Sequence, residues 1–291
     1  MEDAIQKAAA LVEAHQFIRR FAGKTVVVKV GGSIMDEPHT LNGLIQDVCF
    51  MDAVGMHAVI VHGGGKGITS AMEKAGLESQ FVQGRRYTDE RTLAIAEHVL
   101  VNEINTQIIE QIKALGHRGM GLHSLGSCVL CADRLFLTDG DSGRRIDVGL
   151  VGEVEWVNSE LLRALVEAGH IPVVAPIARD RAGGKLNVNA DSAAGQVAAA
   201  LKAEKIVFVT DTQGIRTGDD PEDIAHHLTK DQIEQLVRSG TISAGMLPKV
   251  EAGVSALEAG VAKVHVINGQ IPHALMLEVY TDRGVGTEIV L

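Results

Sequence analysis

Hydrophobic and polar positions along the chain fall into two kinds of run. Short runs rich in β-branched residues are typical of strands that are buried on both faces. They occur at residues 25–30, 57–61, 171–174, 205–209 and 263–267. Longer segments with apolar residues three or four apart predict helices. These segments are 1–22, 40–53, 66–74, a long helix from Thr88 or Asp89 to Leu115, 159–168, an alanine-rich run to Lys202, 229–239, 245–259 and 272–278.

The order of these elements predicts the fold class. A strand, a glycine-rich turn and a helix follow one another twice between residues 25 and 74. This order is typical of an α/β fold with a mainly parallel sheet. Residues 119–156 mix glycines, polar residues and short apolar runs, and they predict β-hairpins that project from the main sheet.

The first strand carries a lysine, Lys29, between valines, and Gly31-Gly32-Ser33 follows it directly. Buried lysines are rare unless they are paired or meet a ligand. Two glycines allow backbone N–H groups to approach a ligand closely, and that ligand is commonly a phosphate. The alternative is a lysine on an edge strand followed by an ordinary turn.

The second strand ends in His62-Gly63-Gly64-Gly65-Lys66. This turn matches neither the dinucleotide fingerprint nor the P-loop. Three glycines at the start of a helix still predict an anion site, because backbone N–H groups and the helix dipole point at the ligand.

Three further segments carry candidate ligand contacts. Arg85 and Arg86 precede a helix and suit a carboxylate, although a solvated basic turn is the alternative. Asn187, Asn189 and Asp191 alternate ahead of a helix that needs one cap, so the excess suggests ligand contacts. Lys249 lies in the first turn of its helix, where a cation opposes the helix dipole unless it faces an anion.

Composition narrows the class of protein. The chain has 291 residues, 46% of them hydrophobic and 3% aromatic, and a net charge of −10. It therefore has an aliphatic core, and no dense basic run favours nucleic acid as a partner. The acidic N-terminus resembles no signal peptide, and no apolar run reaches the ~20 residues that span a bilayer. We expect a cytoplasmic protein without a membrane partner.

The three cysteines, Cys49, Cys128 and Cys131, do not make a disulfide framework. Cys128 and Cys131 have the spacing of a redox or half-zinc motif. They lie in a strand-like run, however, in which residues three apart point to opposite faces. We therefore expect neither a metal site nor a redox role.

Five motifs together resemble the amino acid kinase family. They are Lys29-Val-Gly-Gly-Ser33, His62-Gly-Gly-Gly65, Gly84-Arg-Arg-Tyr-Thr-Asp89, Asn187-Val-Asn-Ala-Asp191 and Gly245-Met-Leu-Pro-Lys249. The resemblance covers nearly the whole chain in the right order. It implies a three-layer αβα sandwich around an open, mainly parallel sheet, with an N-terminal helix extension. It also implies an oligomerisation helix at 1–22, an N-terminal lobe at 23–180 for dimerisation and acyl-amino-acid binding, and an ATP-binding C-terminal lobe at 181–291.

The resemblance assigns a reaction and its residues. ATP, with Mg²⁺ held mainly by the nucleotide and no metal site on the protein, would phosphorylate the γ-carboxylate of N-acetyl-L-glutamate in arginine biosynthesis. Lys29 and Lys249 would neutralise the transferring phosphoryl group, and Asp191 would anchor both. The remaining implied contacts are Gly64, Gly65, Arg86, Asn187 and Asn189 for the acyl substrate, and Gly31, Gly32, Thr210, Asp211 and Gly214 for the nucleotide.

The C-terminal residues His265, Glu278 and Gly284 resemble an arginine site of inhibited members, in which Glu278 would pair with the guanidinium. The N-terminal helix resembles an extension that joins dimers into a hexamer, a trimer of dimers. From its pattern alone, its apolar stripe either meets another subunit or packs on its own domain. The sequence leaves open whether a PII-type signalling protein binds.

Four departures from the family pattern bear on the acyl group. They are Lys66, Tyr87, Asn102-Glu103 and the loop His123–Ser127. They keep open an acceptor such as carrier-bound aminoadipate or glutamate. A non-catalytic arginine-sensing relative is a third hypothesis, disfavoured by the intact lysines and Asp191.

Overall fold

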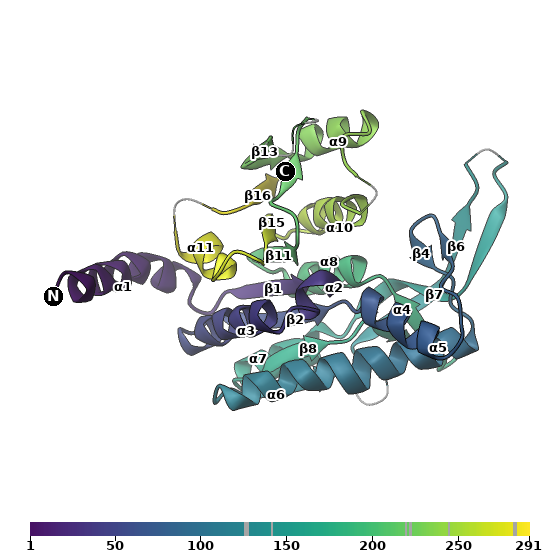
Figure 1. Cartoon of the computed structure of the whole chain (residues 1–291), viewed down its shortest axis with the longest axis horizontal. Coiled ribbons are helices and arrows are strands. Elements are labelled where there is room, and N and C mark those ends of the chain that lie inside the picture. The colour runs from purple at the N-terminus through teal and green to yellow at the C-terminus, as the bar shows by residue number, and fades with distance from the viewer. Residues whose placement is uncertain (125–127, 141, 219, 221–222, 244, 282–283) are drawn as a thin grey trace.

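One eight-stranded sheet organises the chain in the computed structural model, which describes residues 1–124, 128–140, 142–218, 220, 223–243, 245–281 and 284–291 (Figure 1). In sheet order the strands are β14 (His227–Thr229), β16 (Thr287–Val290), β15 (Lys263–Asn268), β11 (Lys205–Thr210), β1 (Thr25–Val30), β2 (His57–His62), β8 (Ile171–Val174) and β5 (Gly119–Leu122). All neighbours pair in parallel except β15 and β16. The predicted mainly parallel sheet is confirmed.

Helices cover both faces of this sheet, as the side chains of β1 require. Val26, Val28 and Val30 belong to one hydrophobic cluster, and Val27 belongs to the other. The first cluster includes side chains of α1 (Glu2–Phe21), α3 (Pro38–Ala53), α6 (Thr106–Ala114) and α11 (Ala274–Tyr280). The second includes side chains of α7 (Ser159–Glu167), α8 (Ala190–Leu201), α9 (Lys230–Arg238) and α10 (Leu247–Glu258). The sandwich of helix, sheet and helix is therefore present.

A second group of strands lies beside the main sheet. It forms a closed barrel of β6 (Leu130–Thr138), β7 (Arg145–Val157), β9 (Ile177–Arg179) and β10 (Lys185–Val188). The long β6–β7 hairpin extends away from the body of the molecule (Figure 1). The prediction of hairpins over 119–156 is right for this part but wrong for 119–122, because β5 pairs with β8 at the edge of the main sheet.

The remaining elements are short or bear on the site. They are α2 (Gly32–Met35), α4 (Gly65–Lys74), β3 (Phe81–Val82), β4 (Arg85–Arg86), α5 (Glu90–Glu97), β12 (Ile215–Arg216) and β13 (Ile224–Ala225). Asp89 caps α5 by accepting from the Thr92 N–H. The predicted helix to Leu115 is interrupted by a π-helical segment, His98–Asn105, between α5 and α6.

The N-terminal helix α1 is packed at one end only. Phe17 and Phe21 are buried, whereas Ile5, Leu11 and Val12 are 61%, 66% and 76% exposed. Figure 1 shows α1 projecting sideways from the sheet. The predicted stripe is thus divided between the domain core and solvent. No helix among the described residues is long and apolar enough to cross a membrane.

The two cysteines expected to point apart lie together, which overturns that expectation. Cys128 precedes β6, which begins only at Leu130, and the β6–β7 register shifts between Cys131 and Ala132. Because Cys128 lies outside the strand and the strand pairing shifts directly after Cys131, the alternation rule does not apply to these two residues. The Cys128 and Cys131 Sγ atoms are 3.1 Å apart.

Candidate active site

Two lysines from distant parts of the chain meet at one carboxylate. Lys29 Nζ lies 2.8 Å from Asp191 Oδ1, and Lys249 Nζ lies 3.4 Å from Asp191 Oδ2. Lys29 and Asp191 are only 5% and 7% exposed. The trio carries one net positive charge, so it offers a largely desolvated place for an anion.

The ends of one strand and two helices position these side chains. Lys29 is the fifth residue of β1, close to its carboxyl end. Asn189 caps α8 by accepting from the Ser192 N–H, and so Asp191 falls in the first turn of that helix. The helix α10 begins at Leu247, and Pro248 and Lys249 follow in its first turn. The positions predicted for Lys29 and Lys249 are confirmed, and α8 packs against both β1 and α10.

Burial and charge act in opposite directions on the pKa values of Lys29 and Asp191. Burial lowers the pKa of Lys29, and the neighbouring Asp191 carboxylate opposes that effect. Burial alone would raise the pKa of Asp191, but Lys29 and Lys249 outweigh it and hold the pKa below its usual value. Asp191 therefore stays ionised, and both of its oxygens are occupied by ammonium groups.

The two glycine turns lie at the same edge of the sheet, after β1 and β2. Gly32 and Gly65 are the first residues of α2 and α4, so their N–H groups have no partner within their helices. The Gly31 N–H donates to the Val209 carbonyl oxygen at 3.0 Å and is already engaged. At Gly64, a Cβ atom would lie 2.6 Å from Leu100 Cδ2 and 2.8 Å from Ile104 Cδ1.

Arg86 is a buried cation with neutral partners. It is 8% exposed, and its Nη2 donates to the Gly65 carbonyl at 2.9 Å and to Thr69 Oγ1 at 2.7 Å. Nη1 donates to Ser79 Oγ at 2.6 Å, and the guanidinium stacks over Phe81 at 4.7 Å. Burial lowers the Arg86 pKa. Within the described ranges no carboxylate forms an ion pair with it, so the positive charge remains available to a ligand.

Most of these groups line one cavity of about 230 Å³, although Lys249 and Gly31 are not part of its described lining. Its walls include Lys29, Asp191, Gly32, Gly63, Gly64, Gly65, Arg85, Arg86, Asn187 and Asn189. Asn187 Nδ2 donates to Thr88 Oγ1 at 3.3 Å. The Asn189 side-chain oxygen is used as the helix cap, which leaves its amide nitrogen for other contacts.

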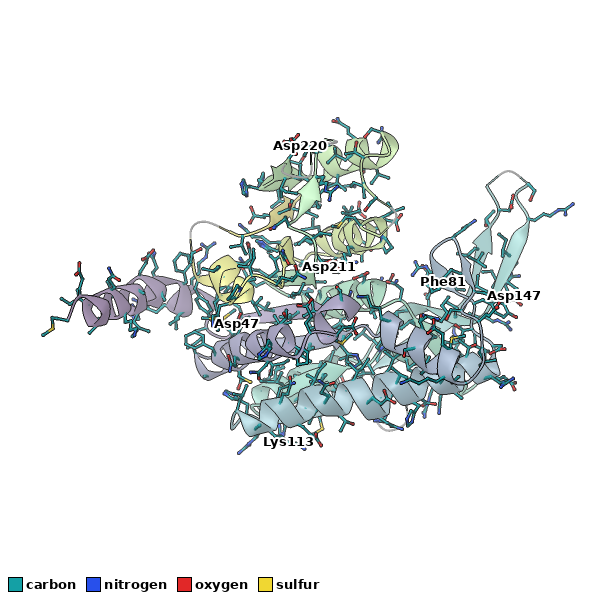
Figure 2. The ribbon with its side chains drawn as sticks, in the orientation of Figure 1. Asp47, Phe81, Lys113, Asp147, Asp211 and Asp220 are labelled. Atoms are coloured by element: carbon teal, nitrogen blue, oxygen red, sulfur yellow. The ribbon has the colours of Figure 1, made fainter. Side chains whose placement is uncertain are left out.

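Of the predicted nucleotide residues, Gly32 lines this cavity, whereas the described lining does not include Gly31, Thr210, Asp211 or Gly214. Thr210 ends β11, the strand beside β1, and its Oγ1 donates to Asp211 Oδ1 at 3.3 Å. Asp211 lies near the middle of the molecule (Figure 2). Gly214 is packed so tightly that a Cβ atom would lie 2.7 Å from Thr287 Oγ1.

Sequence reasoning missed a buried pair behind the second turn. His62 is fully buried, its Nδ1 donates to the Gly63 carbonyl at 2.9 Å, and its Nε2 accepts from Asn105 Nδ2 at 3.1 Å. Asn105 also donates to the Val173 carbonyl at 2.9 Å and lies at the end of the π-helical segment. Burial lowers the His62 pKa to about 4. The only sign of this pair in the sequence was the histidine that directly precedes the three glycines.

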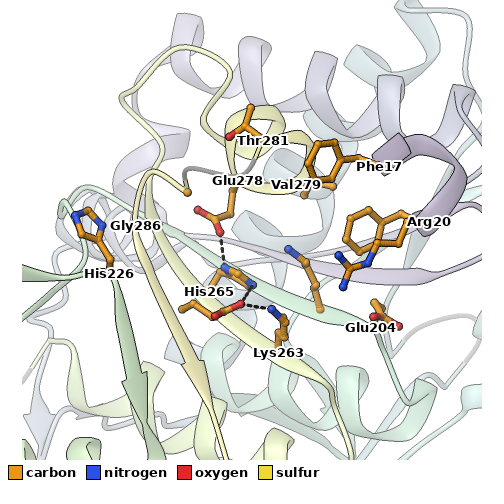
Figure 3. Close-up of a pocket in the computed structure, with 14 residues that line it drawn as sticks. Phe17, Arg20, Glu204, His226, Lys263, His265, Glu278, Val279, Thr281 and Gly286 are labelled. Carbon is orange, nitrogen blue, oxygen red and sulfur yellow. Dashed lines mark hydrogen bonds and ion pairs between the residues drawn. The ribbon is translucent and has the colours of Figure 1, made fainter. Parts of the chain in front are cut away.

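The proposed regulatory residues line a different cavity, of about 640 Å³ (Figure 3). His265 Nδ1 lies 2.5 Å from Glu278 Oε1, and the Val285 N–H donates to Glu278 Oε2. A Cβ at Gly284 would lie 2.7 Å from that same oxygen. The sequence did not reveal Phe17, Arg20, Lys205, Lys263 and Glu288, which line the same space.

The described residues among the departures from the family pattern lie outside the smaller cavity. Among the described residues that line it, Lys66, Tyr87, Asn102 and Glu103 are absent. Lys66 forms an exposed ion pair with Asp36 at 3.1 Å. In the fourth departure, the loop His123–Ser127, residues 125–127 lie outside the described part of the chain.

A metal bound by the protein itself would need several acidic, histidine or cysteine ligands. The described ranges contain no group of three such side chains that could hold a metal ion. Asp191 is a poor ligand because both of its oxygens face lysines.

Comparison with known proteins agrees with this architecture. The profile of the amino acid kinase family matches residues 24–268. A protein of Symbiobacterium thermophilum named acetylglutamate kinase is 41% identical over 290 residues, covering 99% of each chain. One of the same name from Methanocaldococcus jannaschii is 44% identical, covering 99% of this chain and 98% of its own.

Solved structures resemble the fold as well. An N-acetylglutamate synthase from Neisseria gonorrhoeae, complexed with coenzyme A and N-acetyl-glutamate, has a TM-score of 0.87 and 26% identity over 98% of this chain, which spans 63% of that protein. The synthase complexed with coenzyme A and L-arginine has a TM-score of 0.82 at 25% identity, covering 97% of this chain and 65% of that one. A Giardia lamblia carbamate kinase bound to AMP-PNP shares the fold alone, with a TM-score of 0.66 and 14% identity over 92% of this chain and 99% of its own. The chain belongs to the amino acid kinase family.

Proposed function

We propose that this protein uses ATP to phosphorylate the γ-carboxylate of N-acetyl-L-glutamate, giving N-acetyl-L-glutamyl 5-phosphate in the second step of arginine biosynthesis. The observation that carries the proposal is the convergence of Lys29 and Lys249 on Asp191 beside two glycine turns. Full-length relatives named acetylglutamate kinase support the choice of substrate.

The chemistry needs positioning and charge neutralisation more than proton transfer. The substrate carboxylate is already a nucleophile, so no general base is required. Lys29 and Lys249 would neutralise the phosphoryl group as it moves from ATP to the carboxylate, and Asp191 would keep both ammonium groups in place. The backbone N–H groups of Gly32 and Gly65, in the two glycine turns, would donate hydrogen bonds to the phosphate oxygens.

The other ligand contacts follow from the same arrangement. Arg86 would attract the substrate α-carboxylate with its buried positive charge, and it would exchange one of its present hydrogen bonds for one to the ligand. Asn187 and Asn189 would orient the rest of the acyl amino acid, with Thr210, Asp211 and Gly214 bordering the nucleotide. Because Asp191 is occupied, Mg²⁺ would be held mainly by phosphate and water oxygens, where it shields the phosphate charge.

We divide the chain accordingly into an acyl-substrate lobe at 23–180 and a nucleotide lobe at 181–291. The exposed apolar residues of α1 support an oligomerisation role, with a hexamer built as a trimer of dimers. Changing Leu11 and Val12 to glutamate should lower the mass measured by light scattering, and an unchanged mass would contradict the assembly. We further propose that the enzyme works in the cytoplasm.

Regulation by L-arginine is part of the proposal. The 640 Å³ cavity offers Glu278 for a guanidinium and places Lys205 and Lys263 nearby for a carboxylate. The arginine-bound synthase, which has a similar fold, supports this assignment.

The direct test is formation of an acyl phosphate, trapped with hydroxylamine, in the presence of ATP, Mg²⁺ and N-acetyl-L-glutamate. Parallel reactions should contain glutamate or aminoadipate linked to a carrier. We expect turnover with the acetylated amino acid, and clear preference for a carrier-linked acceptor would reject this substrate. Absence of ATP binding by calorimetry would instead favour a non-catalytic arginine sensor.

A further inference from the structure

Two thiols outside the candidate active site face one another. Cys128 Sγ and Cys131 Sγ are 3.1 Å apart, and both side chains are partly exposed. The described residues offer no third His, Cys, Asp or Glu that would complete a metal site with them. Nothing in the proposed kinase reaction uses either thiol.

We infer that Cys128 and Cys131 are a redox-active dithiol that reacts with low-molecular-weight disulfides of the glutathione type and closes into an intrachain disulfide. This inference is independent of the proposed substrate and of the arginine site. It rests on the position of the two sulfur atoms and on the residues around Cys131.

The local backbone brings the sulfur atoms together. Cys128 lies before β6, and the register shift after Cys131 interrupts the regular strand pairing at this point. Forming the bond therefore needs closure over one further ångström or so, because a disulfide joins sulfur atoms about 2 Å apart. Cys131 pairs with Arg179 of β9 on one side and with Trp156 of β7 on the other.

The reaction balances in two exchange steps. The Cys128 thiolate attacks one sulfur of the small disulfide, forms a mixed disulfide and releases one small thiolate. The Cys131 thiolate then attacks the Cys128 sulfur and releases the second small thiolate. The protein loses two electrons and two protons in all, and the small disulfide becomes two thiols.

The surroundings of Cys131 suit this order. Burial raises the Cys131 pKa to about 11, with Cys128 adding to the effect and Arg179 opposing it. Cys131 is therefore a poor first nucleophile at neutral pH. Once Cys128 is capped by the small thiol, its hydrogen bond and charge no longer raise the Cys131 pKa, while Arg179 still favours the thiolate.

The third cysteine serves as an internal control. Cys49 is 4% exposed, and burial raises its pKa to about 11. It has no partner thiol, because the other two cysteines face each other. We expect it to remain reduced while the pair is oxidised.

The experiment treats the folded full-length chain, and a Cys49→Ser variant, with oxidised glutathione, and traps the products in acid. Mass spectrometry should show a loss of about 2 Da, and peptide mapping should place the bond between Cys128 and Cys131. Emission from Trp156, the single tryptophan, should change on oxidation and recover with dithiothreitol. Cys131→Ser should stop at a glutathione adduct on Cys128.

Repeating the exchange reaction in urea tests whether the fold, rather than the spacing of the two cysteines in the sequence, favours the disulfide. Because the fold holds the sulfur atoms together, we expect the equilibrium constant for closure to be about tenfold larger in the native protein than in the unfolded chain. A smaller constant in the native protein overturns the inference. Persistent double glutathionylation of Cys128 and Cys131 in the native chain also overturns it.

Discussion

Two clusters of charged side chains lie at opposite ends of the parallel strands of one sheet. Lys29 is near the carboxyl end of β1, whereas Lys205 and Lys263 are the first residues of β11 and β15. At the carboxyl end, two lysines share one aspartate and leave a net positive charge. At the amino end, lysines and the acids Glu278 and Glu288 line the same cavity.

Because the two regions differ in charge balance, they suit different ligands. An excess of positive charge out of water favours an anion such as a transferring phosphate. A balanced set favours a ligand that carries both signs, as a free amino acid does. One sheet thus carries two cavities that differ in charge balance, one towards each end of its strands.

The largest expected effect comes from Lys29→Ala, which removes a charge from the first region only. We expect kcat to fall by about 1000-fold with the fold retained, because the phosphoryl group loses one of its two ammonium partners. The matched control is Lys74→Ala, at an exposed lysine that ends α4. Steady-state kinetics measure the turnover of both variants, and circular dichroism measures whether their fold is retained. Activity of Lys29→Ala within tenfold of the parent would contradict the role given to this charge.

Asp191→Asn tests the anchor rather than the cations. We expect about a 100-fold loss in kcat and about 3 kcal/mol lower stability, because two lysines then lose their buried counterion. Asp231→Asn, in the exposed first turn of α9, is the matched control. Urea unfolding followed alongside turnover would detect both losses, and a variant as stable as the parent would contradict the ion-pair account.

The buried histidine behind the glycine turn predicts a pH dependence of stability. The His62 pKa is lowered to about 4, against an ordinary value of 6.5. The unfolded chain therefore takes up this proton first, so folding stability is lost as the pH falls from 6.5 towards 4. The loss from this group approaches about 3 kcal/mol at the lower limit. Urea titrations at several pH values should show a smaller loss for His62→Gln, and equal losses would contradict the assignment.

The smallest effect should appear in the second region. Glu278→Gln should weaken arginine inhibition by about 30-fold, because a charge-assisted hydrogen bond is lost, while kcat changes by less than about twofold. Glu258→Gln, an exposed acid paired with Lys230, is the control. Arginine inhibition curves measured at a fixed substrate concentration test this prediction. Unchanged inhibition in the Glu278 variant would mean that arginine binds elsewhere.

Most of the sheet was predictable because its strands are continuous β-branched runs. The 171–174 strand matched its predicted bounds, and 205–209 and 263–267 each differed by one residue. Lys29 and Lys249 were found because a lysine was unexpected in each local pattern. Lys205 and Glu288 were missed because their neighbours come from β15, α1 and α11, which only the folded chain brings close.

Two errors have local causes. The cysteines were assigned to opposite faces because the sequence does not show where β6 begins or where its register shifts. The long helix after Asp89 was predicted as regular because an apolar period near 3.6 cannot reveal a widened turn at 98–105.

The widened turn between α5 and α6 has a consequence for how this family member can change. Leu100 and Ile104 occupy the space where any side chain at position 64 would have to sit. A side chain there would have to push these two side-chain ends aside, and smaller residues at 100 and 104 would relieve the crowding. Selection for new acceptors should accordingly favour linked changes at these three positions over single replacements of the glycine.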